Sequence, residues 1–273
     1  MKLKSEWFSL RILLAIVLCA TASFSAAAEK VNLDPIAERL AVHARKAGTK
    51  SVAVADFLDA DGQPSDLGWY LASKLSDKLQ GRTEGFRLLN RGQLLDSKVT
   101  TEDIASAESL KRIADSWGVA AVVTGTVAIS AQHYLITAIL HRASDGLAMV
   151  TLSQSVPHTQ VLDLLSPAGL DAEARNPELP GANGVDVPAC VYCPIPLYSE
   201  EGRRAGITSA WVILTVTVSR KGNAIKIKRS KDAGYGFTEK AIEAVSDWKF
   251  RPAGRDGTPV PVTVPVEVRF SST

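Results

Sequence analysis

The sequence has few of the residues on which most enzymes and metalloproteins depend. Its 273 residues include only 3 cysteines and 4 histidines, and aromatic residues make up 6% of the chain. It contains no H-E-x-x-H zinc motif, no G-x-S-x-G nucleophile motif and no G-x-x-x-x-G-K phosphate-binding loop. We therefore expect a protein that is not an enzyme and that needs no cofactor or metal.

A strong excess of one charge is absent as well. The formal net charge is +2 with 22% charged residues, which is too balanced for a nucleic-acid-binding protein. The charges are nevertheless unevenly distributed. Residues 29–189 carry 15 basic and 20 acidic side chains, whereas residues 190–273 carry 13 basic and 8 acidic ones. Such a change of sign along a chain indicates two modules with different surfaces.

A stretch that is apolar and long enough to span a membrane is missing except near the N-terminus. Residues 12–28 contain no charge, follow a basic segment and end in three alanines, which is typical of a secretory signal peptide. We therefore predict a signal peptide over residues 1–28, cleaved between Ala28 and Glu29. The alternative is an uncleaved anchor in the inner membrane, because 17 uncharged residues are at the lower limit for crossing a bilayer.

Cleavage would leave two cysteines, Cys190 and Cys193, in an oxidising compartment. Their number and close spacing favour a local disulfide at the start of the last segment. A thioredoxin-like motif is disfavoured, because Pro188 and Pro194 flank the pair and interrupt the helix that such a motif begins. Free thiols, or a redox or metal-binding role, remain as alternatives.

Helical and strand periodicities alternate between residues 29 and 161. The spacing predicts helices over residues 34–46, 65–79 and 106–117. Strands are predicted over residues 51–57, 86–89, 120–129, 134–141 and 147–156. This order predicts an α/β domain over residues 29–161, with a mixed sheet that ends in an antiparallel meander.

Proline and glycine punctuate residues 162–188, which we predict to be a solvated linker. A compact pattern follows over residues 189–273. It predicts helices over residues 198–205 and 238–247, and strands over residues 210–218, 224–229, 248–251 and 260–270. The β-β-α-β order after the first helix predicts a small, separate α+β domain.

Several strings in this last segment follow one another in a recognisable order. They are Pro196-Leu197-Tyr198, the strand WVILTVTV at residues 211–218, WKFRPA at residues 248–253, Asp256-Gly257 and PVPV at residues 259–262. Together they resemble the C-terminal domain of TonB-family proteins over residues 194–270. The resemblance implies a cell-envelope protein of a Gram-negative-type bacterium, located in the periplasm. It also implies TonB-type energy transduction for transmembrane transport.

The last strand is predicted to lie at a sheet edge, because Pro259, Pro261 and Pro265 cannot donate to a strand ladder. An edge can accept an added strand. The resemblance implies pairing with an outer-membrane TonB-dependent receptor or another envelope protein. The residues expected to bind this partner share one face of the strand: Val262, Val264, Val266, Val268 and Phe270. The alternative is a core-facing strand with a proline-protected edge.

The first domain resembles the amino-terminal domain of TolB and the related FlgO-like envelope proteins. The string G-V-x-x-V-V-x-G-T-V at residues 118–127 carries most of this likeness. The resemblance implies a scaffold or assembly module. An alternative function is therefore a soluble periplasmic assembly factor that binds peptidoglycan or an appendage or secretion complex. Membrane contact is expected only through the N-terminal segment, if that segment is uncleaved.

Overall fold

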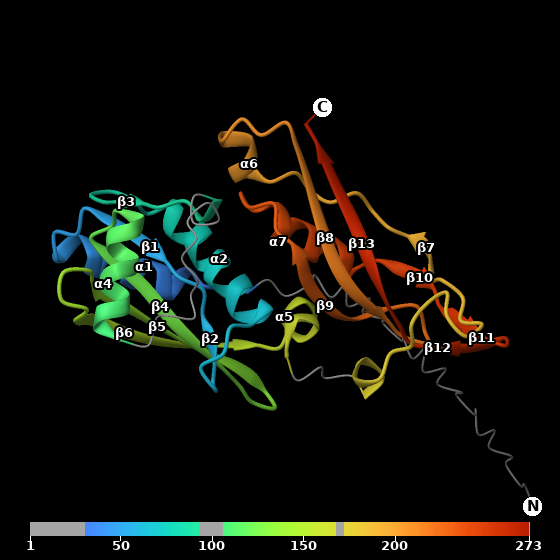
Figure 1. Cartoon of the computed structure of the whole chain (residues 1–273). Helices are drawn as coiled ribbons and strands as arrows, with labels where there is room; N and C mark the ends of the chain where they lie inside the picture. The colour runs from blue at the N-terminus through green and yellow to red at the C-terminus, as the bar shows by residue number, and fades with distance from the viewer. Residues whose placement is uncertain (1–30, 93–105, 168–171, 273) are drawn as a thin grey trace, which may run out of the picture.

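The computed structural model describes residues 31–92, 106–167 and 172–272. The predicted signal peptide and its cleavage site, Ala28 and Glu29, lie outside the described residues. The two larger sheets of the described residues, each packed against helices, lie side by side (Figure 1). The prediction of a mixed α/β protein is confirmed. We refer to residues 31–157 as the N-terminal domain and to residues 189–272 as the C-terminal domain. Among the described helices, none is long and apolar enough to cross a bilayer.

The N-terminal domain is built on a six-stranded sheet with the order β3-β1-β4-β5-β6, in which β2 also pairs with β4. Strand β1 runs parallel to β3 and β4, whereas β4, β5 and β6 form an antiparallel meander. The strands are β1 (Ser51–Val54), β2 (Leu58–Asp59), β3 (Arg87–Leu88), β4 (Ala121–Ile129), β5 (His133–Arg142) and β6 (Ala148–Pro157).

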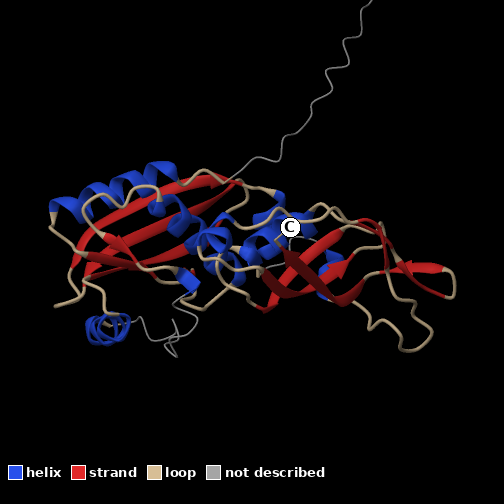
Figure 2. Cartoon of the chain, turned by 90° about the horizontal axis from the view of Figure 1, so that it is seen from above, coloured by secondary structure: helices blue, strands red, loops and turns tan. Residues whose placement is uncertain are grey.

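Helices cover both faces of this sheet (Figure 2). Helices α1 (Asp34–Lys46) and α2 (Asp66–Gln80) contribute to one apolar core, and α4 (Ala107–Trp117) to a second one on the other face. The sequence determines where these helices begin. Ser65 and Ser106 accept the N–H groups of Gly68 and Ser109, at 3.0 and 3.1 Å, and so satisfy donors that a helix start leaves unpaired.

The C-terminal domain contains a three-stranded antiparallel sheet with the order β13-β8-β9. Helix α7 packs on one face of it, because Ala241, Ile242 and Val245 point towards the sheet core. Two small pairs, β10 with β7 and β11 with β12, flank this sheet. The elements are β7 (Ala189–Tyr192), α6 (Glu200–Arg204), β8 (Ser209–Val218), β9 (Ala224–Lys231), α7 (Phe237–Ser246), β10 (Lys249–Arg251), β11 (Ala253–Arg255), β12 (Thr258–Val260) and β13 (Val262–Ser271).

The segment between the domains differs from the prediction of a solvated linker over residues 162–188. Helix α5 (Gln160–Leu165) lies between the domains (Figure 1) and packs against β9 and α7. Its three leucines, Leu162, Leu164 and Leu165, are buried, which stabilises the contact between the domains. A short 3₁₀ helix, η2 (Ala172–Arg175), follows. Proline and glycine content alone therefore overestimated the length of exposed chain.

Candidate functional site

Strand β13 lies at one edge of the C-terminal sheet. It pairs with β8 along its whole length, from Val262 opposite Val218 to Ser271 opposite Ser209. Within the described ranges, no strand pairs with its other side. The edge position agrees with the expectation from the prolines, since Pro265 sits in the middle of the strand and has no N–H to donate.

The backbone groups that face away from β8 can be identified from one contact. The N–H of Thr263 donates to the carbonyl of Glu178, at 3.4 Å, and Glu178 in turn donates to the carbonyl of Pro261, at 2.8 Å. The backbone of Thr263 therefore faces the outer side of the strand. Because backbone groups alternate in direction along a strand, the groups at residues 265, 267, 269 and 271 also face outward. We refer to residues 265–271 of β13 as the open edge.

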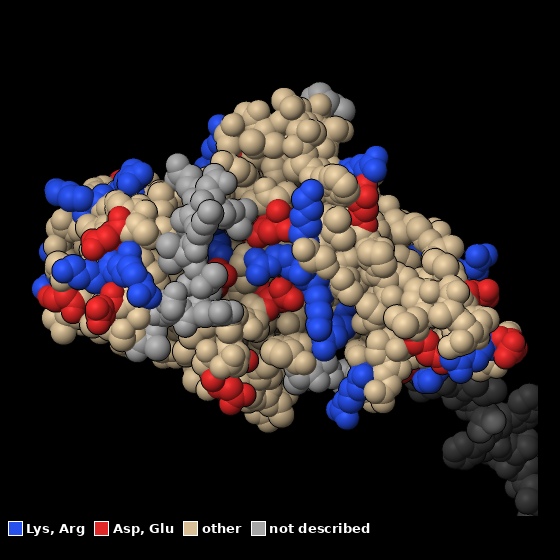
Figure 3. All heavy atoms as spheres, viewed as in Figure 1, with Lys and Arg blue, Asp and Glu red and all other residues tan. Residues whose placement is uncertain are grey.

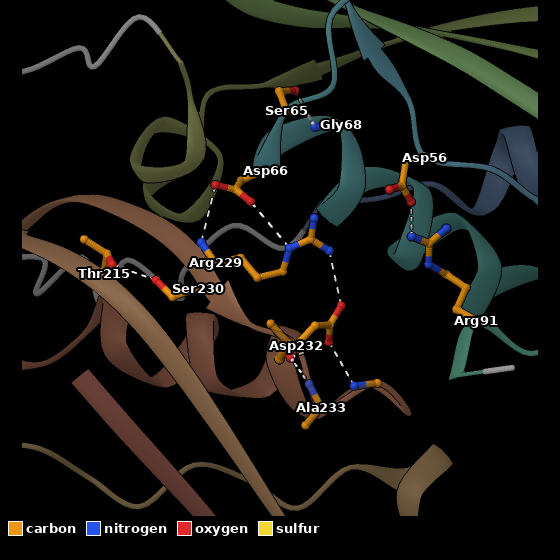
Figure 4. Close-up of polar contacts among 12 residues, drawn as sticks. Asp56, Ser65, Asp66, Gly68, Arg91, Thr215, Arg229, Ser230, Asp232 and Ala233 are labelled. Atoms are coloured by element: carbon orange, nitrogen blue, oxygen red, sulfur yellow. Dashed lines mark hydrogen bonds and ion pairs between the residues drawn. The ribbon is translucent and has the colours of Figure 1, made fainter. Parts of the chain in front are cut away.

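The opposite edge of the same sheet is closed by the N-terminal domain. The backbone N–H of Arg229, on β9, donates to Asp66 Oδ2 at 3.3 Å (Figure 4). The Arg229 guanidinium lies 3.5 Å from Asp66 Oδ1 and 4.2 Å from the ring centroid of Trp69. Helix α5 packs along the same strand. The sheet is therefore covered at β9 and uncovered at β13.

The five side chains that were predicted to bind a partner lie inside the domain. Val262, Val264, Val266, Val268 and Phe270 are all buried, none more than 8% exposed, because they form the inner face of β13 beneath α7. These side chains hold the strand in place and are not available at its surface. The outward side chains belong to the alternate residues of the same strand, chiefly Pro265, Glu267 and Arg269. The alternation of residues along this strand in the sequence separates the side chains of its two faces, but it did not show which face is exposed to solvent.

The predicted disulfide between Cys190 and Cys193 is present. It lies at the start of the C-terminal domain, where Cys190 stands opposite Phe250 in the pairing of β7 with β10. This pairing was not expected from the sequence. Several apolar side chains near the disulfide are exposed: Val191, Tyr192, Ile195 and Leu197.

Charged side chains of both signs gather on the surface between the two domains (Figure 3), and several polar contacts join the domains there. The hydroxyl of Ser73, on α2, donates to Glu239 on α7, and Lys74 forms an ion pair with Glu243. Burial raises the pKa of Glu239 to about 7. Burial also tends to raise the pKa of Glu243, but the positive charges of Lys74 and Lys240 outweigh it, so that this pKa is lowered. None of these contacts between domains was expected from the sequence.

Comparison with known proteins identifies the C-terminal domain. Residues 194–272 match the family of Gram-negative bacterial TonB protein C-terminal domains. The chain is 33% identical over 88 residues to Protein TonB of Vibrio cholerae serotype O1, which covers 32% of this chain and 36% of that protein. The chain therefore spans about a third of the length of this curated relative.

Solved structures give weaker similarities. The LpoB C-terminal domain from Salmonella enterica is 10% identical, with a TM-score of 0.35 over 46% of this chain and 95% of that one. TolB from Acinetobacter baumannii is 13% identical, with a TM-score of 0.27 over 68% of this chain and 36% of that one. Similarities at this level carry no argument about function. The resemblance of the N-terminal domain to TolB and FlgO-like proteins therefore stays a prediction.

The family match and the identity to TonB agree with the order of motifs in the last segment. They support a Gram-negative cell-envelope protein. The C-terminal domain, over residues 194–272, therefore belongs to the family of TonB C-terminal domains.

Proposed function

We propose that this protein binds cell-envelope partners by adding an extended segment of the partner to the open edge of β13. The single observation that supports this most strongly is the asymmetry of the C-terminal sheet. Its β9 edge is closed by Asp66 and α5, while residues 265–271 of β13 present backbone groups without a neighbouring strand in the described part of the chain. Unpaired backbone groups at an edge favour strand addition.

The outward backbone groups define what a partner strand would contact. Glu267, Arg269 and Ser271 each offer an N–H and a carbonyl, and Pro265 offers a carbonyl alone. Main-chain hydrogen bonds of this kind provide affinity for any extended segment, and neighbouring side chains provide selectivity. The family match favours an outer-membrane TonB-dependent receptor as the partner. This role requires no covalent chemistry.

The edge can be tested by replacing Glu267 with proline. Glu267→Pro removes one outward N–H, and proline is already accommodated at Pro265, which has the same orientation two residues earlier. We expect the variant to lose co-sedimentation with purified outer-membrane vesicles, while Glu267→Ala retains it. Circular dichroism of both variants checks that the fold is unchanged. Full binding by a folded Glu267→Pro variant would contradict the proposal.

A substitution such as Val266→Asp is a poor test of the same proposal. Val266 is 8% exposed, and burying an uncompensated carboxylate would unfold the domain rather than remove a contact.

Energy transduction further requires that the chain be held at the inner membrane. The sequence predicts cleavage before Glu29, which would give a free periplasmic protein. Such a protein would not be held at the inner membrane, so a motor there would not transmit force to it directly. The intact mass of the protein from envelope fractions decides this. We expect a chain that begins at Glu29. A chain that keeps Met1 and fractionates with the inner membrane would contradict cleavage and would favour an energy transducer.

A further inference from the structure

A pocket opens where the open edge of β13 ends. It has a volume of about 360 Å³ and lies at the Ser271 end of the strand, between this end and the segment that leads from α6 into β8. An extended segment that pairs with residues 265–271 advances about 3.3 Å per residue. The residue of this segment just beyond the position opposite Ser271 is therefore level with the pocket along the strand axis. The lining residues are Tyr198, Arg203, Gly206, Ile207, Thr208, Ser271 and Ser272.

The pocket has a positive charge and hydroxyl groups but no acidic side chain in its described lining. Arg203 is the charged residue, and its Cζ lies 5.8 Å from the ring centroid of Tyr198. Its one ion pair in the described part of the chain, with Glu200, is 3.6 Å long, and the two side chains are 63% and 73% exposed. Such a pair is weak and screened by water. The guanidinium can therefore exchange this partner for a carboxylate that enters the pocket.

The walls of the pocket are fixed by packing. The hydroxyl of Tyr198 donates to the carbonyl of Ile207, and its ring packs edge-on against Phe237, with centroids 5.1 Å apart. Gly202, on the adjoining α6, allows this close packing, because a Cβ there would lie 2.3 Å from Cζ of Phe237. A preformed pocket lowers the entropy that binding has to overcome.

We infer that this pocket receives a carboxylate-bearing residue of the segment that adds to β13, with Arg203 as its counter-ion. The inference rests on the proposed docking at the open edge and adds a selectivity rule to it. Backbone pairing alone accepts many extended segments, whereas Arg203 favours those with Asp or Glu just beyond the position opposite Ser271.

The test is a selection of displayed random nine-residue segments on the purified chain and on its variants. Segments that bind the unchanged chain but not Glu267→Pro are the ligands of the open edge. Among these we expect Asp or Glu at one fixed position, and Lys or Arg at that position after selection on Arg203→Glu. Arg204→Glu is the matched control, because Arg204 is the next residue, is exposed and does not line the pocket.

A selected segment is then synthesised with Asp or with Asn at the enriched position. We expect the unchanged chain to bind the Asp form about tenfold more tightly, and Arg203→Glu to lose this preference. Edge ligands without a charge preference, or with one that Arg203→Glu leaves unchanged, would overturn the inference while edge docking stands. If no selected segment depends on the Glu267 N–H, both the docking proposal and this inference are overturned.

Discussion

At the scale of single residues, Glu239 is a carboxyl group that is almost fully buried. It lies on α7 with 3% of its surface exposed, and its Oε2 has no hydrogen-bond partner in the described part of the chain. Burial raises its pKa to about 7, which the hydrogen bond from Ser73 opposes and the charges of Asp232 and Asp77 reinforce. The carboxyl is therefore largely protonated in mildly acidic solution when the protein is folded.

This pKa predicts a pH dependence of stability. Because the folded pKa lies above the ordinary value of 4.5, the folded state binds more protons between pH 4.5 and about 7. The free energy of unfolding therefore falls as the pH rises through this interval. We expect Glu239→Gln, which is neutral, to remove the decline and to stabilise the protein by roughly 1–3 kcal/mol at pH 8. Urea unfolding of both proteins at several pH values measures the free energy of unfolding and its pH dependence.

Glu243 provides the opposite case for comparison. Its pKa is lowered, so its contribution to stability is present near neutral pH and is lost as the pH falls through the folded pKa. Glu243→Gln should accordingly destabilise the protein at pH 7.

A Glu239→Gln variant whose stability has the same pH profile as the unchanged chain would contradict the prediction for Glu239. It would show that the burial of the Glu239 carboxyl is not maintained in solution.

At the scale of elements, the contact between α2 and β9 determines which sheet edge is exposed. Asp66, in the first turn of α2, accepts from the backbone of β9, and Trp69 on the same helix lies beneath the Arg229 guanidinium. Burial raises the pKa of Asp66, whereas Arg229 and Lys228 lower it in part. The first turn of α2 therefore occupies a position that a further strand would take.

Removal of Arg229 should weaken this contact. We expect Arg229→Ala to lower the free energy of unfolding by roughly 1–2 kcal/mol, because it loses the stacking on Trp69 and the ion pairs with Asp66 and Asp232. Arg229→Lys should retain only part of the stability that Arg229→Ala loses, since an ammonium lacks the planar shape that stacks on a ring. Lys221→Ala, at an exposed turn, is the control. Equal stability of all three variants would contradict this role.

How well the sequence predicted the elements depends on how local each signal is. The leucine spacing predicted α2 to within a residue, whereas the alternation of valines separated the two faces of β13 without showing which face is buried. The contacts between domains were missed, because Arg229 and Glu239 look like ordinary surface charges in the sequence. Their partners, Asp66 and Ser73, lie 163 and 166 residues away. A pattern within a short stretch of sequence contains no information about contacts between residues so far apart in the chain.

At the scale of the whole molecule, the two domains share one apolar core. The buried cluster runs from α1 and α2 through the leucines of α5 to α7 and the C-terminal sheet. Domains that share a core of this kind are expected to unfold together. The sequence predicted two modules joined by a linker, and the structure shows modules that are packed against each other.

Calorimetry can test whether the domains unfold as one unit. We expect a single thermal transition for the unchanged chain. Leu162→Asp places a charge at a fully buried position of α5, so the variant should show two separate transitions. Leu179→Asp, at a position that is 73% exposed, is the control and should keep the single transition. Two transitions in the unchanged chain would show that the shared core contributes little cooperativity.

The chain already places one of its own residues on the edge that a partner would use. Glu178 bridges to the start of β13 and forms an ion pair with Arg255, so the first residues of the strand are occupied. About 20 Å of edge remains beyond it, which suits a segment of about seven residues. A partner that pairs further towards the start of β13 has to displace Glu178 first. The connecting segment thereby limits how many residues of a partner can pair with β13 without competition.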